Sequence, residues 1–166
     1  MTRLEALKNI PRPAEECVEK TLNGEVPVDL FIARGHPNVR ASNKRTLEVT
    51  KDVYLTRRGD CIIACCAEKA AGELSATVLE ALMRSGLVVL IIDAGVVWDY
   101  VIGITPRSKP ASKWRLVARK SNYVDDSTIA ILADKAAYDL DRTLIRELKR
   151  GVPVRIIVGV CPGDSI

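Results

Sequence analysis

The sequence predicts an α+β fold in which a strand-strand-strand-helix-strand unit occurs twice. Residues 67–93 and 133–159 align without a gap, and ten of the 27 positions are identical. Both segments open on one motif, which reads Ala-Glu-Lys-Ala-Ala at 67–71 and Ala-Asp-Lys-Ala-Ala at 133–137. Upstream, both halves keep the same spacing from a proline to a lysine, at residues 37–51 and 106–120. A repeat of this kind indicates an internal duplication, so we expect a mixed sheet system with pseudo-twofold symmetry.

The chain divides into an N-terminal helical extension, residues 1–27, and two repeats, residues 28–96 and 97–166, packed as one globular domain. A chain of 166 residues with 48% hydrophobic side chains can bury a sizeable core, which excludes the disordered class. Residues 1–23 favour helix, interrupted at Pro11 and Pro13, and Asn23 with Gly24 predicts its end.

Strands and helices follow the same order in each repeat. Polar and apolar residues alternate over 45–50, as in a half-exposed strand, whereas residues 61–66 and 87–92 are apolar throughout, as in strands covered on both faces. We expect further strands at 28–33, 97–104, 114–119, 128–132 and 154–160. Apolar residues at helical spacing predict one helix that opens at the first motif and ends at Gly86, and another over 136–150. A strand-helix-strand order predicts a right-handed parallel crossover.

The bulk properties favour a cytoplasmic protein. No apolar run approaches the roughly 20 residues of a membrane helix. Charged residues interrupt the first ten residues, where a signal peptide would be apolar. There is one histidine and no C-x-x-C pair, so we predict no metal site. Cys61, Cys65 and Cys66 are expected to be buried thiols, and a Cys17–Cys161 bridge would suit a hyperthermophile. The sequence does not decide which cysteines are oxidised.

Basic residues are concentrated in two corresponding stretches, although the net charge is only +4. The first stretch contains Arg34, Arg40, Lys44, Arg45, Lys51, Arg57 and Arg58, and the second contains Arg107, Lys109, Lys113, Arg115, Arg119 and Lys120. Clustered arginine and lysine side chains are typical of surfaces that bind phosphate groups.

Each motif places a lysine, Lys69 or Lys135, where we expect a helix to begin. A lysine there opposes the helix dipole, but beside free backbone N–H groups it would complete an anion site. The alternative is an ion pair with Glu73 or Asp139, four residues on, in the weaker orientation. If Lys69 holds an anion, replacing it with alanine should weaken binding and leave the fold intact.

Two loops of the first repeat carry the remaining candidates. The ligand-binding candidates in these loops are Arg34, Gly35, Asn38, Arg58 and Gly59, because the glycines would let a ligand approach the backbone. With Lys69, Lys120 and Lys135 they form the predicted ligand-binding set. The candidate general bases are His36, Glu48 and Asp60. The spacing matches no P-loop and no dinucleotide-binding motif.

Several motifs in order resemble an uncharacterised archaeal family, the domain of unknown function 371. They are residues 33–39, 46–50, 55–63, 119–121 and 133–137, and the resemblance covers about Phe31 to Val158. The N-terminal extension lies outside it. Members of the family often carry a histidine where Asn43 stands, which weakens any metal or histidine-dyad hypothesis here. The resemblance implies an archaeal cytoplasmic protein and no assigned activity.

Two functions remain open at this point. The first is a binding module for RNA or a nucleotide; its weakness is that only 4% of residues are aromatic, which leaves few stacking surfaces. The second is a small enzyme with a site built from the first repeat around Arg34, His36, Arg58, Asp60 and Lys69. No cofactor is indicated, and self-association into a homo-oligomer is left open. A concave pocket around these residues would favour the enzyme, and an open basic surface would favour nucleic acid.

Overall fold

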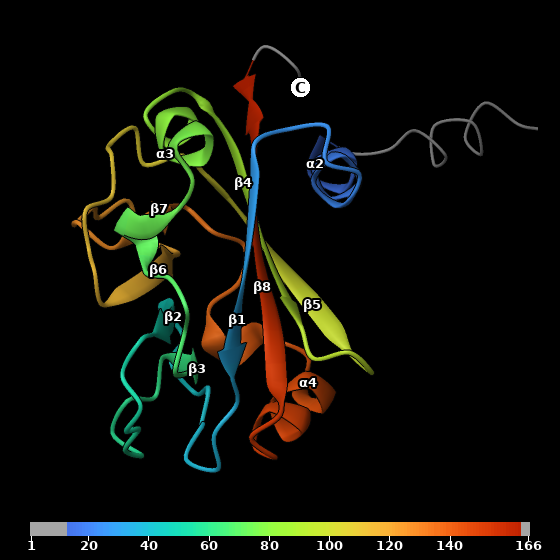
Figure 1. The fold of residues 1–166 in the computed structure, drawn as a ribbon, viewed down its shortest axis with the longest axis vertical. Coiled ribbons are helices and arrows are strands. Elements are labelled where there is room, and N and C mark those ends of the chain that lie inside the picture. The colour runs from blue at the N-terminus through green and yellow to red at the C-terminus, as the bar shows by residue number, and fades with distance from the viewer. Residues whose placement is uncertain (1–12, 164–166) are drawn as a thin grey trace, which may run out of the picture.

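The structure is a computed structural model that describes residues 13–163. Within this range three α-helices, eight strands and two 3₁₀ turns form an α+β fold, as the sequence predicts (Figure 1). The first half contains α2 (Pro13–Leu22), β1 (Val28–Arg34), β2 (Thr46–Thr50), β3 (Ile62–Ala64), η1 (Ala71–Glu73), α3 (Ala76–Leu82) and β4 (Gly86–Asp93). The second contains β5 (Trp98–Ile104), β6 (Arg115–Arg119), β7 (Thr128–Ala130), η2 (Ala137–Asp139), α4 (Arg142–Leu148) and β8 (Pro153–Pro162).

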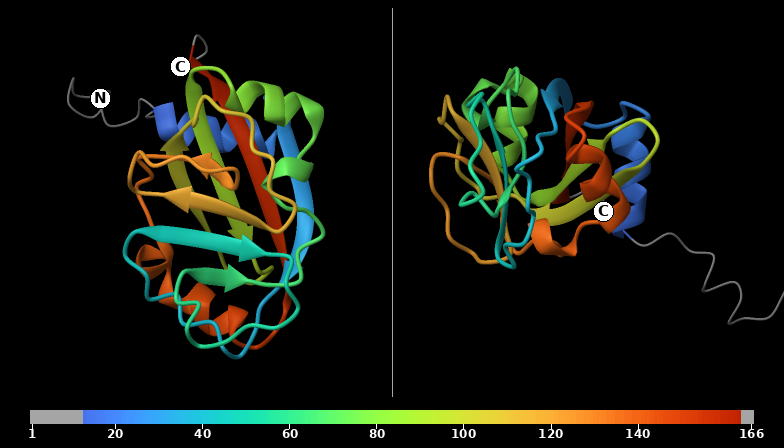
Figure 2. Two further views of the ribbon diagram at one scale, coloured as in Figure 1. Left: turned by 90° about the vertical axis from the view of Figure 1, so that its left-hand side faces the viewer. Right: turned by 90° about the horizontal axis from the view of Figure 1, so that it is seen from below.

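Two four-stranded sheets lie face to face. Sheet A has the order β1-β8-β4-β5, and sheet B, which faces the viewer in the left view of Figure 2, has the order β3-β2-β6-β7. The central pairs, β4 with β8 and β2 with β6, are antiparallel, and each joins a strand of one half to a strand of the other. The outer strands of sheet B pair in parallel, so this sheet is mixed. The main core lies between the sheets, with α3 and α4 at opposite ends (Figure 1).

The edges of sheet A are joined to sheet B by the residues that follow β3 and β7. Antiparallel bridges connect Arg34 to Cys65 and Ile104 to Ile131. The acid of each motif then accepts a backbone hydrogen bond from the neighbouring edge strand, Glu68 from Ile32 at 2.6 Å and Asp134 from Ile102 at 2.8 Å. The motif acids therefore hold the two sheets together at both edges.

The outer face of sheet A is covered by α2. Cys17 and Val18 of this helix are buried against Val89, Ile91 and Ile157. A disulfide joins Cys17 to Cys161 on β8, 144 positions along the chain, with their Cα atoms 6.0 Å apart. Gly159 on β8 lies directly under Thr21, where any side chain would collide with the helix. The bridge that the sequence left open is therefore present; the part of the extension before Pro13 lies outside the described residues.

The prediction that helices begin at the motifs is wrong. Residues 67–70 and 133–136 are extended or irregular, a 3₁₀ turn follows, and the α-helices begin only at Ala76 and Arg142. The residues of the apolar stripes are nevertheless buried, with Leu74 and Leu140 the clearest cases. The parallel crossover is also wrong, because β3 and β4 belong to different sheets and β4 pairs antiparallel with both its neighbours.

The same elements and contacts occur in both halves. Lys51 N–H donates to the carbonyl of Trp114, and Lys120 N–H donates to that of Arg45. Likewise Asp29 accepts from Ser75 N–H and Asp99 accepts from Asp141 N–H. The donors Lys51 and Lys120, and Ser75 and Asp141, are equivalent in the repeat alignment, although the origin of the two halves by duplication stays a prediction.

Candidate functional site

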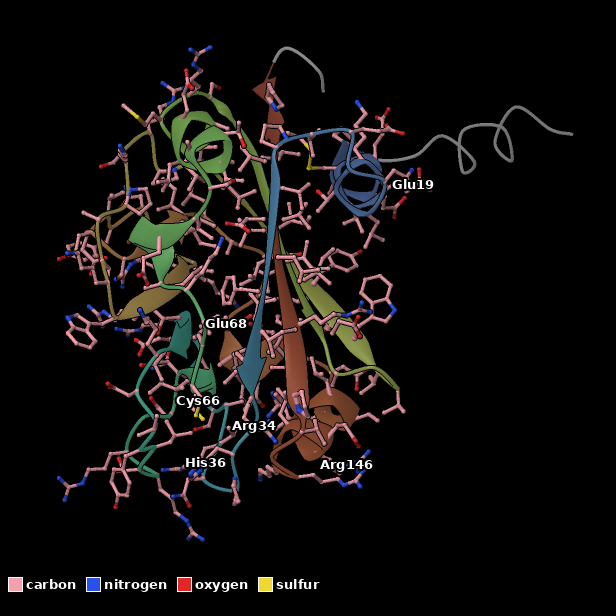
Figure 3. The ribbon with its side chains drawn as sticks, in the orientation of Figure 1. Glu19, Arg34, His36, Cys66, Glu68 and Arg146 are labelled. Atoms are coloured by element: carbon pink, nitrogen blue, oxygen red, sulfur yellow. A yellow bond between two sulfur atoms is a disulfide. The ribbon has the colours of Figure 1, made fainter. Side chains whose placement is uncertain are left out.

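Three segments of the chain meet at one end of the molecule, where β1 and α4 end. They are the loop 35–45, the loop 51–61 and α4. Arg40 donates to the carbonyl of Arg57 at 3.2 Å, and Asn38 donates to the carbonyl of Leu55 at 2.8 Å, which joins the two loops. Arg142 of α4 donates to the carbonyl of Ala41 at 3.1 Å. The labelled side chains of Arg34, His36 and Arg146 all lie at this end (Figure 3).

This end carries exposed basic side chains, and we call it the basic end: Arg34, Arg40, Lys44, Arg57, Arg58 and Arg146. Within residues 13–163 none of the six forms an ion pair with a carboxylate. Arg34 donates instead to the carbonyl of Gly151, and Arg146 donates to the hydroxyl of Thr143. Their charges are therefore available to an external anion.

Two exposed tyrosines accompany these charges. Tyr138, in η2, is 52% exposed, and Lys44 Nζ lies 5.1 Å from its ring centroid. Arg142 approaches the same ring at 5.9 Å. Tyr54, in the loop 51–61, is 78% exposed. Such rings offer flat apolar faces on which a nucleobase could stack.

Gly35 and His36 shape the loop that follows β1. Gly35 is buried, its N–H donates to the carbonyl of Val152 at 2.9 Å, and an added Cβ would collide with the carbonyl of Leu148 at the end of α4. The glycine therefore lets α4 pack closely against β1. His36 is half-buried, and its Nδ1 accepts from the N–H of Asn38 at 3.0 Å.

Asp60 and Gly59 belong to the turn before β3. The carbonyl of Asp60 accepts from the N–H groups of Ser42 and Asn43, and its carboxylate accepts from the side chain of Asn43 at 3.2 Å. At Gly59 an added Cβ would approach the side chain of Ile62. These contacts hold the loop 35–45 against the turn that carries Arg58.

Lys69 and Lys135 lie elsewhere, whereas Lys120 borders the basic end, where its N–H donates to the carbonyl of Arg45. All three lysines are paired. Lys69 donates to both oxygens of Asp29, at 2.9 and 3.1 Å, and Lys135 donates to Asp99 at 2.7 Å and to the carbonyl of Tyr100. Lys120 pairs with Asp139 at 2.7 Å. Asp29 and Arg34 are five positions apart on β1, or about 17 Å, so Lys69 is remote from the basic end. The alternative that the sequence offered, an ion pair of Lys69 with Glu73 or of Lys135 with Asp139, is also wrong, because Glu73 pairs with Lys51 and Asp139 with Lys120.

Glu48 lies on the outer face of sheet B in a network of charges. Arg115 bridges Glu48 and Asp125, each at 3.3 Å, and Arg119 contacts Asp125 at 2.8 Å. Burial raises the pKa of Glu48, which Arg115 partly opposes. Burial alone would raise the pKa of Asp125, but hydrogen bonds from Ser127 and Thr128 with the charge of Arg119 hold it well below its usual range.

A half-buried thiol completes this face. Burial raises the pKa of Cys61, and the negative charge of Glu48 adds to the effect. The prediction of three buried thiols is wrong in part, because Cys61 and Cys66 are only half-buried and Cys65 alone of the three is buried. Among the hydrogen bonds of residues 13–163, none joins His36 to Glu48 or to Asp60, so the three candidate bases are not assembled by direct contact.

A cavity of about 740 Å³ lies at the opposite end of the molecule, beside α3. Its lining includes Thr77, Glu80, Arg84 and Ser85. None of the predicted site residues lines it. The sequence-predicted residues Arg34, Gly35, His36, Asn38, Arg58, Gly59 and Asp60 are instead gathered at the basic end. Glu48, Lys69 and Lys135 are not, and Lys120 only borders it.

Sequence reasoning missed the contribution of α4 and η2. Arg142 and Tyr138 reach the loop 35–45 from about a hundred positions away, and no local pattern reveals such a contact. The one available signal was the charge difference between the aligned helices, since Arg142 and Arg146 stand where the first half has Ala76 and Glu80.

Comparison with known proteins agrees with the resemblance seen in the sequence. A family model described as a domain of unknown function, number 371, matches residues 31–161. The chain belongs to this family. An uncharacterized protein of Methanocaldococcus jannaschii is 37% identical over 123 residues, which cover 72% of this chain and 89% of that protein. Across residues 13–163, no helix has the length and apolar character needed to cross a membrane.

Proposed function

We propose that this protein is a binding module for a phosphate-bearing ligand, and that the ligand is RNA held at the basic end. The observation that carries the proposal is the set of six exposed cations that have no carboxylate partner within residues 13–163. Five of them lie on the loops 35–45 and 51–61 and on α4, and the sixth, Arg34, ends β1. Arginine binds phosphate oxygens through two parallel hydrogen bonds, so Arg34, Arg57 and Arg58 are the principal contacts.

The paired lysines are less suited to this role. Binding an anion at Lys69 would require its ammonium group to leave Asp29, whose side chain is only 10% exposed. The same holds at Lys135 and Asp99. A competing ligand would therefore have to compensate for a carboxylate left without its partner. The proposed ligand site accordingly keeps Arg34 and Arg58 of the predicted set and leaves the lysines of the motifs in a structural role.

RNA is favoured over a free nucleotide by the shape of the basic end. Nucleotide sites are usually enclosed, whereas the cations here lie on exposed loops and the 740 Å³ cavity is elsewhere. Tyr138 and Tyr54 supply stacking surfaces for unpaired bases, which offsets the low aromatic content. The enzyme alternative receives less support, because Lys69 and Glu48 lie away from Arg34 and His36. A cytoplasmic location, where RNA is available, is part of this proposal.

The test is a titration of a fluorescent single-stranded RNA, followed by anisotropy, against wild type and Arg57→Ala/Arg58→Ala. The matched control is Lys109→Ala/Lys113→Ala, which removes two exposed charges from the loop 105–114 of the second half, the counterpart of the loop 36–45. We expect the basic-end variant to lose about tenfold in affinity, or about 1.4 kcal/mol. The slope of log affinity against log salt concentration should become shallower by about 1.4, because each of the two lost phosphate contacts contributes about 0.7.

The control variant should keep nearly wild-type affinity. Equal losses of affinity in the two variants would mean that RNA binding depends only on the net charge of the protein, and would reject the basic end as the site. Failure of the wild type to bind, or competition by ATP as effective as that by RNA, would reject RNA as the ligand.

A further inference from the structure

Cys65 and Cys66 form a vicinal pair of thiols at the start of the first motif. Their Sγ atoms are 2.6 Å apart, only about 0.5 Å beyond the ~2.05 Å of a disulfide bond. Both are free thiols in this structure; Cys65 is buried and Cys66 is half-buried. Figure 3 shows Cys66 at the same end of the molecule as Arg34, whose backbone is bridged to Cys65.

The backbone holds the two sulfurs in this position. Cys65 exchanges both backbone hydrogen bonds with Arg34, at 2.8 and 2.9 Å. Cys66 N–H donates to the carbonyl of Asp52, and Ala67 N–H donates to that of Thr50. Cys66 has a φ of 59°, a left-handed conformation that a side chain other than glycine adopts only when its surroundings impose it.

The second half shows that the fold imposes this conformation and the sequence supplies the thiols. Leu132, which aligns with Cys66, has a φ of 49°, and its N–H donates to the carbonyl of Ser121 as Cys66 does to Asp52. Ile131 aligns with Cys65. The bend is therefore common to both halves, and only the first half places two sulfur atoms on it.

We propose that Cys65 and Cys66 are a redox modification site, at which a low-molecular-weight disulfide oxidises the two thiols to a vicinal disulfide. The thiol of Cys66, the more exposed, attacks the reagent, forms a mixed disulfide and releases one reagent thiol. The thiol of Cys65 then attacks Cys66 Sγ and releases the second. Two protein thiols are oxidised and one reagent disulfide is reduced to two thiols. This site is independent of the proposed RNA binding.

The chemistry of the pair fits this order of steps and a reversible bond. Burial, and the hydrogen bond shared with Cys66, raise the pKa of Cys65 to about 12, so Cys65 stays protonated at neutral pH and does not react first. Adjacent Cα atoms lie about 3.8 Å apart, closer than the ~4.4–6.8 Å of ordinary disulfides. A bond formed at this spacing is strained and readily reduced, as regulatory disulfides are.

To test this, folded protein is incubated with oxidised glutathione, and the remaining free thiols are then blocked with N-ethylmaleimide in denaturant. Mass spectrometry counts the N-ethylmaleimide groups added to each molecule. The wild type has three free cysteines and should fall from three additions to one, at Cys61. Tryptic cleavage leaves Cys61, Cys65 and Cys66 in the single peptide 59–69, so Cys61→Ser assigns the bond. That variant should fall from two additions to none, with the loss of two hydrogen atoms from the peptide.

Cys66→Ser should keep both of its remaining thiols, at Cys61 and Cys65, after the same treatment. A subsequent dithiothreitol titration should reopen the Cys65–Cys66 bond well before the bridge between Cys17 and Cys161. In Cys61→Ser, two additions after oxidation, or a stable glutathione adduct on Cys66, would overturn the proposal. Circular dichroism checks that each variant is folded.

Discussion

A single carboxylate at the start of β1 explains why each motif contains a lysine. Asp29 accepts from Lys69 Nζ at 2.9 Å and from Ser75 N–H at 2.7 Å, so it fixes both the motif and the start of α3. Asp99 does the same with Lys135 and Asp141. The sequence showed a lysine in the wrong place for a helix start. The aspartate that pairs with each lysine lies some forty positions earlier in the chain, and the periodicity of the sequence cannot reveal so distant a contact.

Replacing Lys69 with alanine should destabilise the protein by about 1–3 kcal/mol, because Asp29 would stay mostly buried without its cation. This reverses the expectation from sequence alone, that the variant would keep its stability. Thermal unfolding should report a fall in Tm of several degrees, at about 2–4 °C per kcal/mol. Lys109→Ala, an exposed loop lysine, serves as control and should leave Tm unchanged. An unchanged Tm for Lys69→Ala would show that the pair contributes no stability.

At the scale of elements, strands were easier to predict than helices. Alternation over 45–50 and the apolar run 87–92 correspond closely to β2 and β4, since a strand's pattern is local. The helices are shorter than the apolar stripes suggested. The carboxylate of Glu73 accepts the N–H of Ala70, and Leu74 has extended angles, so η1 ends before α3 begins. The sequence therefore predicted correctly which apolar residues of these segments are buried. It did not predict their backbone conformation, which depends on side-chain hydrogen bonds such as that of Glu73.

Helix α2 depends on its covalent link more than the other helices do. It packs on the outer face of sheet A, apart from the main core, and Cys17 is its bridge to β8. Cys17→Ser should lower the free energy of unfolding by about 2–5 kcal/mol, since a bridge over so long a loop restricts the unfolded chain most. Proteolysis should then cut within α2 first. Cys61→Ser, a free thiol, is the control; equal effects of the two variants would contradict a specific role for the bridge.

At the scale of the whole molecule, the two halves are interleaved. Sheet A alternates between halves, because β1 pairs with β8 and β5 pairs with β4. The basic end is likewise built from both, with the loops of the first half and α4 of the second. The sequence predicted two similar units and the arginines Arg34 and Arg58. Their assembly with Tyr138 and Arg146 depends on strand pairing between the halves, which no motif encodes.

Neither half should fold alone. A fragment of residues 24–96 lacks β8 and β6, and a fragment of residues 97–163 lacks β4 and β2, so each loses one of the two central strands of both sheets. We expect both fragments to give unfolded circular dichroism spectra, and their mixture to regain strand signal. The intact chain should unfold in one cooperative transition. A fragment with a sigmoidal melting curve of its own would contradict this.

The edge strands of sheet A have a further consequence for how partners can attach. Along each edge the N–H groups of three alternate residues are already occupied: Leu30, Ile32 and Arg34 on β1, and Tyr100, Ile102 and Ile104 on β5. An extended peptide that adds a strand to a sheet needs these groups free. The same occupancy protects the sheet from edge-to-edge aggregation. A partner that approaches β1 or β5 must therefore recognise side chains rather than extend the sheet.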